Sequence, residues 1–569
     1  MFRYSKELAQ MALGNQKAPL VLKNANLVQV FTNEIIQADI AIADGYIVGV
    51  GTYHGEQEVD LSGRYVCPGF IDAHLHLEST LVNPAELIET ASLRGTTTFI
   101  VDPHEAANVS GTEGIDYILN ETEESQANVY VMMPSCVPAG PFEDNGCTLT
   151  AEDMKSYVGN PRILGLGEVM DCGGVLNGDS ALLDKLTLFR DKSIDGHAGY
   201  LNEEATNAYS LAGIGSDHEC CTFEAALREM RAGFQILVRE GSAAKNLDPI
   251  IRGVVANRLP YHQLAFCTDD KHIADIRIDG HINYNVRRAI ALGVPPIEAI
   301  KIGSLYPAKH YGLRHLGAIA PGFQADILVL SDLEQVTVER VYHKGVPVVE
   351  YLERHRPVPE NLLNTVHIKL DGIEALRLPM CHSKARVIEL IPGEILTKEC
   401  MADVKVEEGF FQSDATYQKI VVLERHRATG KIGIGIVKGF SIQGGAIAST
   451  VGHDSHNLIA VGDEDEEIYR AIRALEACGG GYTVVVKGQE PVVIPLEIMG
   501  LMSNECDEVV QPKLSEMIEI ARSLGVPEGI APFINLSFLS LPVIPEVRIT
   551  PRGLYHVTEG CFKPVNEKG

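Results

Sequence analysis

The sequence predicts an α/β protein built around a (β/α)8 barrel, with a small β domain beside the barrel and an α+β domain after it. Three observations carry this prediction. The 569 residues are too many for one hydrophobic core, so two or three domains are expected. From Pro68 to about Leu313, short apolar runs alternate with helical patterns, which indicates βα units and a parallel sheet. Eight such runs occur in this stretch, the number that a (β/α)8 barrel needs.

The expected barrel strands are short, mostly apolar and each followed by a helical pattern. In chain order they are residues 69–71, 97–101, 129–133, 163–166, 192–194, 212–214, 235–238 and 263–266. In a barrel of this kind the active site is built at the carboxyl ends of the strands. The polar residues that follow the strands are therefore the first candidates for function.

The segments that flank the barrel have a different pattern of apolar and polar residues. Residues 21–66 alternate apolar and polar side chains, with a hairpin signal at Asp44-Gly45, which predicts a small β domain. A similar strand-like pattern occurs again at 317–345.

Beyond about residue 357 the pattern changes again. Strand-like runs at 431–439 and 482–487 enclose a helical pattern at 465–477, which the glycines from Gly479 onward would end. This part is predicted to be a third domain of the α+β class.

Two histidines follow the first expected strand. The run 66–71 is apolar and reads as a buried strand, and His74 and His76 come directly after it. Residues two apart on a strand share a face, so both imidazoles are expected on one side. That spacing suits two ligands of one metal ion.

Further polar residues of the types that bind metal ions stand at the ends of later strands. After strand 2 come Asp102, His104 and Glu105, after strand 4 Glu168, after strand 5 His197, after strand 6 His218, and after strand 8 Asp269 and Asp270. Any one histidine is more often structural than a ligand. Six His and acidic residues at matching strand ends predict a metal site instead.

Composition excludes several other classes of function. The formal net charge is −28, so the chain has no basic excess for binding nucleic-acid phosphates. No stretch is long and apolar enough for a membrane span, and residues 1–20 lack the apolar region of a signal peptide. The 12 Cys show no paired spacing, which favours reduced thiols in a cytoplasmic protein. We also expect a homo-oligomer, a dimer.

The stretch from Pro68 to His76, Pro-Gly-Phe-Ile-Asp-Ala-His-Leu-His, resembles the first barrel strand of the amidohydrolase superfamily. The resemblance implies a barrel at 68–314 inserted in a small β-sandwich formed by 1–67 and 315–356, followed by the C-terminal domain at 357–569. It also implies a two-metal site. Its implied ligands are His74, His76, Glu168, His197, His218 and Asp269.

The chemistry of such a site explains the residue types. Two divalent ions need a bridging anion, and where many relatives use a carboxylated lysine, strand 4 here offers Glu168. A hydroxide between the ions would be the nucleophile, because bound metal lowers the pKa of water to near neutrality. Asp269 would accept its proton and return it to the leaving group. Asp270 is the alternative for that role.

Other motifs narrow the resemblance to the bacterial adenine deaminase family. They are Val-Asp-Pro-His-Glu at 101–105, Asp-Gly-His-Ala at 195–198, Ser-Asp-His-Glu at 216–219, and the C-terminal stretches 450–457 and 496–503. The resemblance implies hydrolysis of adenine to hypoxanthine and ammonia in purine salvage. It implies Mn²⁺ or Fe²⁺ as the metal, and the nitrogen and carboxylate donors leave Zn²⁺ open.

Substrate contacts are expected from Asp102, His104 and Glu105. Attack at C6 of adenine needs a proton or strong hydrogen bond at N1, and Glu105 could supply it if burial raises its pKa. A solvated surface cluster is the alternative interpretation. The cluster at 453–456, His-Asp-Ser-His, is expected near the barrel mouth and is assigned no metal, because a hydrogen-bonded turn explains it equally well.

Two other functions are alternatives to the deaminase activity that the resemblance implies. A cyclic-amide hydrolase of the dihydroorotase or hydantoinase type would share the barrel, but Glu168 in place of lysine and the extra C-terminal domain argue against it. A non-catalytic scaffold would be expected to have lost ligands, and none is missing from the sequence. The sequence leaves the metal used in the cell and the acceptance of other 6-substituted purines open.

Overall fold

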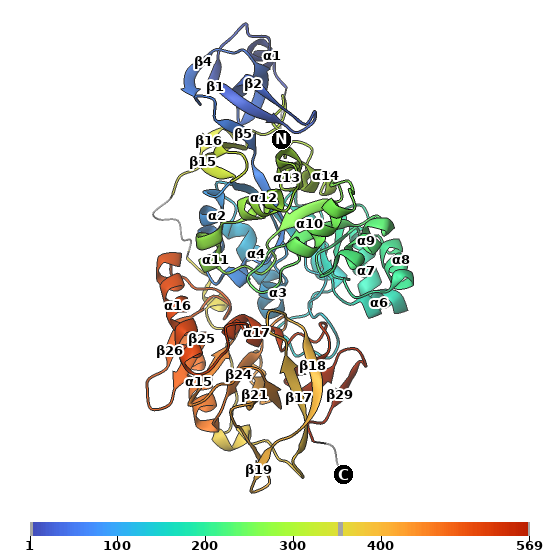
Figure 1. Cartoon of the computed structure of the whole chain (residues 1–569), viewed down its shortest axis with the longest axis vertical. Coiled ribbons are helices and arrows are strands. Elements are labelled where there is room, and N and C mark those ends of the chain that lie inside the picture. The colour runs from blue at the N-terminus through green and yellow to red at the C-terminus, as the bar shows by residue number, and fades with distance from the viewer. Residues whose placement is uncertain (1–3, 351–356, 567–569) are drawn as a thin grey trace.

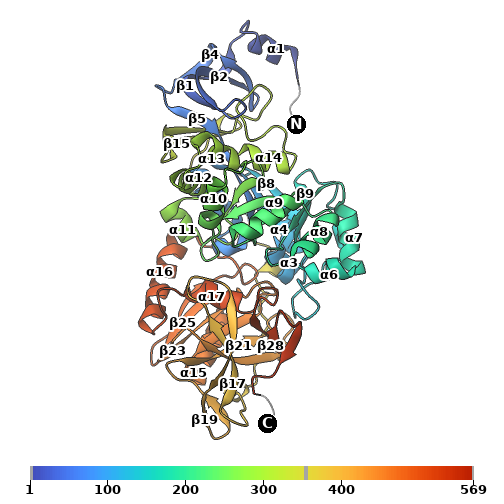
Figure 2. The same cartoon turned by 45° about the vertical axis from the view of Figure 1, so that its right-hand side comes forward.

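The computed structural model describes residues 4–350 and 357–566, and arranges them in three parts along the long axis of the molecule (Figure 1). The small β domain lies at one end, the barrel in the middle and the C-terminal domain at the other end, and the turned view keeps this order (Figure 2). Residues 1–3, 351–356 and 567–569 lie outside the described residues. The predicted domain boundary between residues 356 and 357 lies at the edge of one of these segments.

The small β domain unites two segments that are far apart in the sequence. Within the described residues it is a mixed eight-stranded sheet, in which β5 before the barrel pairs antiparallel with β14 after it. Helix α1 (Lys6–Ala12) packs Leu8 against Val21 and Val48 of this sheet. The strands are β1 (Ala18–Gln29), β2 (Glu34–Ala43), β3 (Tyr46–Gly51), β4 (Gly55–Asp60), β5 (Tyr65–Pro68), β14 (Ile327–Asp332), β15 (Thr337–His343) and β16 (Val346–Pro347).

Strands β6 to β13, all within the described part of the chain, form a parallel barrel, and the bounds 68–314 for this domain stay a prediction. One sheet has the order β10-β9-β8-β7-β6 and a second the order β11-β12-β13. The sheets meet at two seams. At one seam Gly215 N donates to Ile194 O at 2.9 Å, and at the other Asp269 N donates to His74 O at 3.0 Å. The strands are β6 (Phe70–Leu75), β7 (Thr96–Val101), β8 (Asn128–Met133), β9 (Ile163–Val169), β10 (Ser193–Gly196), β11 (Ser216–Asp217), β12 (Gln235–Arg239) and β13 (Leu264–Cys267).

A buried aspartate strengthens the seam between β6 and β13. Asp72 accepts hydrogen bonds from Thr268 N at 3.1 Å and from Thr268 Oγ1. Every residue of β6 is buried, as expected for a parallel strand covered on both faces. Asp72 therefore satisfies its carboxylate inside the barrel wall instead of facing the site.

The sixth strand differs from its prediction. The strand is Ser216–Asp217, whereas the apolar run 212–214 follows helix α8 (Glu203–Leu211). Gly213 N bonds back to Ser210 O and has a φ of +97°, so this run ends the helix and enters a turn. Ile214 is buried but does not pair with a neighbouring strand. An apolar run by itself cannot distinguish a buried strand from a buried turn.

Several barrel helices begin at side-chain caps that the sequence contains. Asn83, Asp179, Asn202 and Thr222 each accept a backbone N–H of the following first turn. Besides α8, the helices of the barrel are α2 (Pro84–Ser92), α3 (His104–Ser110), α4 (Thr112–Glu121), α5 (Ala151–Met154), α6 (Cys172–Asn177), α7 (Ser180–Phe189), α9 (Phe223–Ala232), α10 (Leu247–Ala256), α11 (Ile273–Asp279), α12 (Ile282–Ala291), α13 (Pro296–Ile302) and α14 (Leu305–His310).

The C-terminal domain has a sheet of order β18-β17-β22-β21-β24-β23-β25-β26, with two smaller sheets beside it among the described residues. Helix α15 (Asp465–Cys478) packs on this sheet and ends at Gly479, which has a φ of +79°, as the sequence predicts. The remaining elements are β17 (Lys384–Leu390), β18 (Thr397–Asp403), β19 (Lys405–Glu407), β20 (Phe410–Gln412), β21 (Tyr417–Leu423), β22 (Ile432–Lys438), β23 (Gly445–Ser449), β24 (Leu458–Gly462), β25 (Gly481–Val486), β26 (Val492–Pro495), α16 (Asp507–Ser523), α17 (Pro532–Phe538), β27 (Val547–Thr550), β28 (Gly553–His556) and β29 (Cys561–Lys563).

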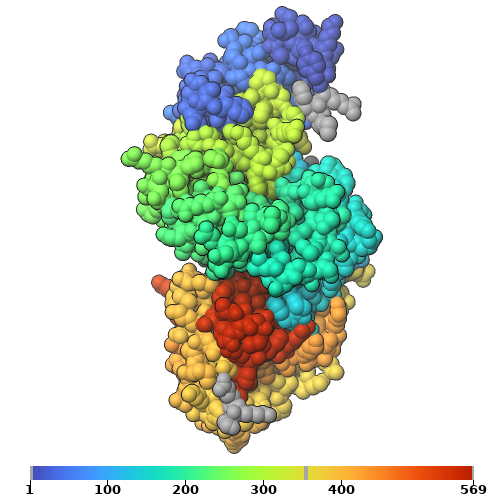
Figure 3. All heavy atoms as spheres, turned by 90° about the vertical axis from the view of Figure 1, so that its right-hand side faces the viewer, coloured from blue at the N-terminus to red at the C-terminus, as the bar shows by residue number. Residues whose placement is uncertain are grey.

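The C-terminal domain is packed against the barrel. One hydrophobic cluster contains Leu75 and Phe99 of the barrel together with Ile447 and Phe533 of the C-terminal domain. At the rim, Arg552 Nε lies 2.8 Å from Asp144 Oδ2. Figure 3 shows the C-terminal segment, in red, against the cyan part of the barrel. The two domains thus share a core at the end of the barrel where its strands finish.

Candidate metal-binding active site

Six side chains converge at the carboxyl ends of the barrel strands. His74 lies on β6, Glu168 lies on β9, and the others follow β6, β10, β11 and β13. None of the six is more than 8% exposed. They are the six residues predicted from the sequence as metal ligands: His74, His76, Glu168, His197, His218 and Asp269.

The first group of donors brings two histidines to two carboxylates. His76 Nε2 lies 3.2 Å from Glu168 Oε1 and 3.2 Å from Asp269 Oδ1. His74 Nε2 lies 3.5 Å and 3.6 Å from the same two oxygens. The ligand atoms of His74, His76 and Asp269 are close enough to hold one ion between them.

The second group uses the other oxygen of the same glutamate. His197 Nδ1 lies 2.7 Å from Glu168 Oε2, and His218 Nε2 lies 3.3 Å from it. Glu168 therefore divides its two oxygens between two pairs of histidines. This is the arrangement that a carboxylate bridging two ions requires.

The donor set fits divalent metal ions. Several of its buried atoms have no hydrogen-bond partner within the described residues, among them both ring nitrogens of His74, Nε2 of His197 and Oε1 of Glu168. Unpaired polar atoms are costly in a protein interior, and coordination would satisfy them. The pKa of His218 is raised to about 9, because the Glu168 carboxylate outweighs the effect of burial. The same negative charge would attract a cation.

Asp102 and His104 lie beside this centre. Asp102 Oδ2 accepts from Glu168 N at 2.8 Å, and its backbone oxygen lies 2.9 Å from His76 Nδ1. Asp102 thus orients two predicted ligands, in the way that second-layer groups orient metal ligands. His104 Nδ1 lies 3.4 Å from Glu168 Oε1, so His104 is as close to the bridging carboxylate as the predicted ligands are. Both residues were expected as substrate contacts, and they stay predictions in that role.

Glu105 pairs with the C-terminal domain. His453 Nδ1 lies 2.8 Å from Glu105 Oε1, and both side chains are buried. Burial raises the pKa of Glu105, but the charge and hydrogen bond of His453 outweigh it, and the pKa lies well below its ordinary value. The pKa of His453 is raised to about 9 because Glu105 outweighs its burial. The condition stated for Glu105 as the proton donor to N1, a pKa raised by burial, is therefore not met.

Sequence reasoning did not single out Arg239. This residue ends β12 and is 2% exposed, and its guanidinium lies between Asp269 and Glu219. A charged residue at the end of a buried apolar strand was the available signal. Asp454 was assigned no role, and its Oδ1 lies 3.6 Å from His104 Nε2. The cluster at 453–456 thus lies at the barrel mouth, as expected.

The C-terminal domain closes the site. The cavity at the metal-ligand cluster has a volume of about 20 Å³, and Phe538, Leu541 and Ile544 form its wall opposite the barrel. A volume of this size holds about one water molecule. Side chains or the domain must therefore move before a purine-sized molecule can enter.

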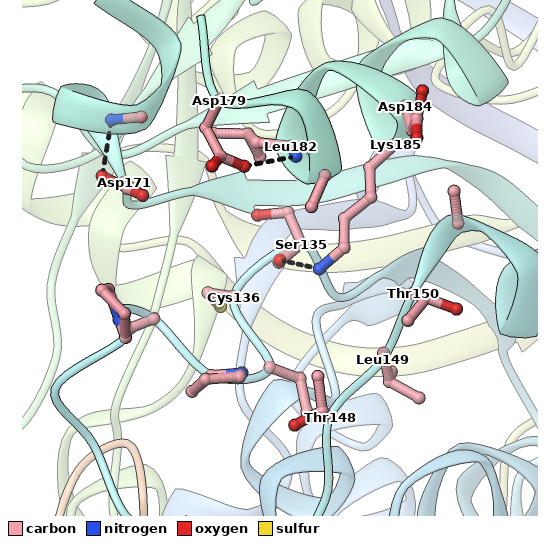
Figure 4. Close-up of a pocket in the computed structure, with 18 of the residues that line it drawn as sticks. Ser135, Cys136, Thr148, Leu149, Thr150, Asp171, Asp179, Leu182, Asp184 and Lys185 are labelled. Atoms are coloured by element: carbon pink, nitrogen blue, oxygen red, sulfur yellow. Dashed lines mark hydrogen bonds between the residues drawn. The ribbon is translucent and has the colours of Figure 1, made fainter. Parts of the chain in front are cut away.

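A larger cavity of about 1100 Å³ is lined by the loops that follow β8 and β9 and by residues of α5, α6 and α7 (Figure 4). In it Lys185 Nζ donates to Ser135 O at 2.7 Å, and Ser135 Oγ in turn donates to the backbone oxygen of Glu168. Cys136 and Ala139 line this cavity and pack against Met170, which lines the site cavity. The two cavities thus share a thin apolar wall.

Comparison with known proteins gives two family matches. Residues 65–348 match the amidohydrolase family, and residues 394–561 match the adenine deaminase C-terminal domain. A protein of Desulfitobacterium hafniense named adenine deaminase is 51% identical over 98% of both chains. Another of that name from Clostridium acetobutylicum is 44% identical over 98% of this chain and 99% of its own.

Solved structures resemble the chain more weakly. A crystal structure described as an adenine deaminase has a TM-score of 0.44 and 16% identity, and covers 55% of this chain and 90% of that one. Within the described residues, no helix combines the length and the apolar character needed to cross a membrane.

Proposed function

The chain belongs to the adenine deaminase family, with a barrel of the amidohydrolase family, and on this premise we propose that its buried site hydrolyses adenine to hypoxanthine and ammonia. The observation that carries the assignment to this site is the position of Glu168, which offers one oxygen to His74 and His76 and the other to His197 and His218. The reaction adds the oxygen of water to C6 and breaks the C6–N6 bond.

His74, His76, Glu168, His197, His218 and Asp269 would hold two divalent ions. When bound, the metal supplies Lewis acidity and a nucleophilic water at neutral pH. The residues of the chain supply the rest. Asp269 Oδ1 faces the ligand cluster, so it takes the proton of the attacking water and passes it to the departing N6, which leaves as ammonia.

The buried pair of Glu105 and His453 supplies the proton for the other side of the base. At neutral pH the pair holds one proton between Glu105 Oε1 and His453 Nδ1. We assign this proton to N1 of adenine, delivered through Glu105, because N1 gains electron density as C6 is attacked. The proton that remains on the new C6 oxygen leaves as the C6–N6 bond breaks and restores the pair, so the two hydrogens of water are accounted for on N6 and N1. His104 lines the same cavity as Glu105 and His453, and Asp102 stays a proposed substrate contact.

Several finer features belong to this proposal. The family resemblance implies Mn²⁺ or Fe²⁺, and nitrogen and carboxylate donors without thiolate are compatible with both and also permit Zn²⁺. The free cysteines among the described residues favour a cytoplasmic enzyme, with a role in purine salvage. We further propose a homodimer.

A panel of substrates tests the proposal. Purified enzyme supplied with Mn²⁺ should release ammonia from adenine, and a hydantoin and dihydroorotate should give no product. Glu168→Ala should abolish the release and so link it to this site. Turnover of the cyclic amides without release of ammonia from adenine would favour the cyclic-amide hydrolase instead.

A further inference from the structure

A second cluster of metal-binding side chains lies between the barrel and the C-terminal domain. Glu105 comes from the first turn of α3, and His453 and His456 come from the loop between β23 and β24. All three are buried, and one ligand atom of each lies within 4.8 Å of the others. None of the three belongs to the predicted ligand set of the catalytic centre.

His456 is the unusual member of this cluster. It is 0% exposed, and neither ring nitrogen has a hydrogen-bond partner within the described residues. The second oxygen of Glu105, Oε2, is also buried without a partner there. Buried polar atoms are almost always paired in native proteins, so such a group points to a missing ligand.

The residue types decide which ligand fits. Two imidazoles and one carboxylate form the protein donor set of well-known zinc sites. Burial lowers the pKa of His456 well below its ordinary value, so its ring is neutral and can donate an electron pair. About 3.4 Å separates donors around a tetrahedral ion with bonds of about 2.1 Å, so small side-chain rotations would complete the site.

We propose that Glu105, His453 and His456 form an additional site for a divalent transition metal such as Zn²⁺, and that its occupation inhibits the enzyme. An ion bound there takes the place of the proton shared by Glu105 and His453, so neither the proton nor the free carboxylate is left for substrate. The inhibitory part rests on the proposed function, and the binding part does not.

Metal counting tests the binding. Full-length enzyme is stripped with a chelator and dialysed against increasing Zn²⁺, and metal per chain is measured by elemental analysis. Wild type should bind one ion more than His456→Ala. His426→Gln is the matched control, because His426 is half-buried beside the same loop and its Nε2 already pairs with Ser455 O at 2.7 Å. Equal counts in wild type and His456→Ala would overturn the proposal.

A crystal of the wild type tests the location without a variant. Zn²⁺-soaked crystals should show an anomalous difference peak between the three side chains, and a well-occupied catalytic centre without this peak would overturn the site.

Inhibition is tested by kinetics, in which enzyme loaded with Mn²⁺ is assayed with added Zn²⁺. The concentration for half-inhibition should rise at least about tenfold in His456→Ala, and an unchanged value would reject inhibition. If no deamination occurs at all, the ion count and the peak still decide the binding.

Discussion

Arg239 Nη1 donates to Asp269 Oδ2 at 2.7 Å, while the other oxygen of Asp269 faces His76 at 3.2 Å. Burial raises the pKa of Asp269, but Arg239 and His76 outweigh it, and the pKa lies well below its ordinary value. The guanidinium thus keeps this aspartate ionised and turned toward the ligand cluster. Asp270 instead hydrogen-bonds Ser79. The orientation of Asp269 toward the ligand cluster favours it over Asp270 as the proton carrier, although burial raises the pKa of Asp270 to about 6, nearer to neutrality.

The first prediction concerns this choice. Asp269→Asn should lower kcat by about 10²- to 10⁴-fold, because an amide cannot accept the proton, and it should keep the fold and much of the metal. Steady-state kinetics and elemental analysis measure both effects. Asp270→Asn is the matched control. An inactive Asp270→Asn beside a near-normal Asp269→Asn would show that the wrong aspartate was chosen.

The second prediction concerns the bridging carboxylate. Glu168→Ala should lose at least one ion per chain, because among the described residues no other carboxylate is paired with both groups of histidines. Elemental analysis after gel filtration measures the loss. Glu219→Gln is the control, since Glu219 lies 3.6 Å from His218 but pairs with Arg239, and it should keep both ions. Full metal content and activity in Glu168→Ala would contradict the assignment.

The third prediction concerns the proton for the base. Glu105→Gln should lower turnover of adenine by roughly 10²-fold or more, the scale of a general-acid contribution, and leave the ions of the catalytic centre in place. The assay is kcat for adenine together with metal content at limiting metal. Unchanged turnover would remove Glu105 from the mechanism and leave the metal centre as it is.

The fourth prediction concerns substrate size and charge. Arg239 is the one Arg or Lys among the described residues that line the site cavity, and it is already paired with two carboxylates. A phosphate would therefore meet negative charge without a basic partner. Adenine should be strongly preferred over AMP in kcat/KM. Comparable values for the two compounds would refute a site built for the free base.

The fifth prediction concerns pH and stability. Glu143 is 7% exposed, both carboxylate oxygens lack a hydrogen-bond partner within the described residues, and burial raises its pKa to about 8. Between its ordinary pKa and pH 8 the folded state holds more protons at this group than the unfolded state does. This group therefore lowers stability as pH rises through that window.

Glu143→Gln removes this ionisation. It should raise Tm at pH 8.5, with a gain of up to a few kcal/mol in the free energy of unfolding, and change Tm little near pH 4.5. Thermal unfolding at both pH values measures the effect. The exposed Glu152→Gln is the control and should show no such difference. A stabilisation equal at both pH values would rule out ionisation as the cause.

The sequence by itself determined the barrel and the predicted ligands of the site. Strand patterns are local, and the predicted ligands Glu168 and His197 are recognisable because each stands at the end of a predicted strand. The spacing of His74 and His76 on one strand also places both imidazoles on one side without any tertiary information. The sixth strand was misplaced, because burial makes a loop as apolar as a strand.

Only the tertiary structure decided which residues act on those ligands. Arg239 reaches Asp269 across neighbouring strands, and His453 reaches Glu105 from another domain. The sequence contains no local signal for such pairs, because the segments that form them are distant in the chain. The protonation state of Glu105 is likewise decided by a contact between distant segments. Its pKa depends on a charge that folding brings to within hydrogen-bond distance, and in a low-dielectric interior this charge outweighs burial.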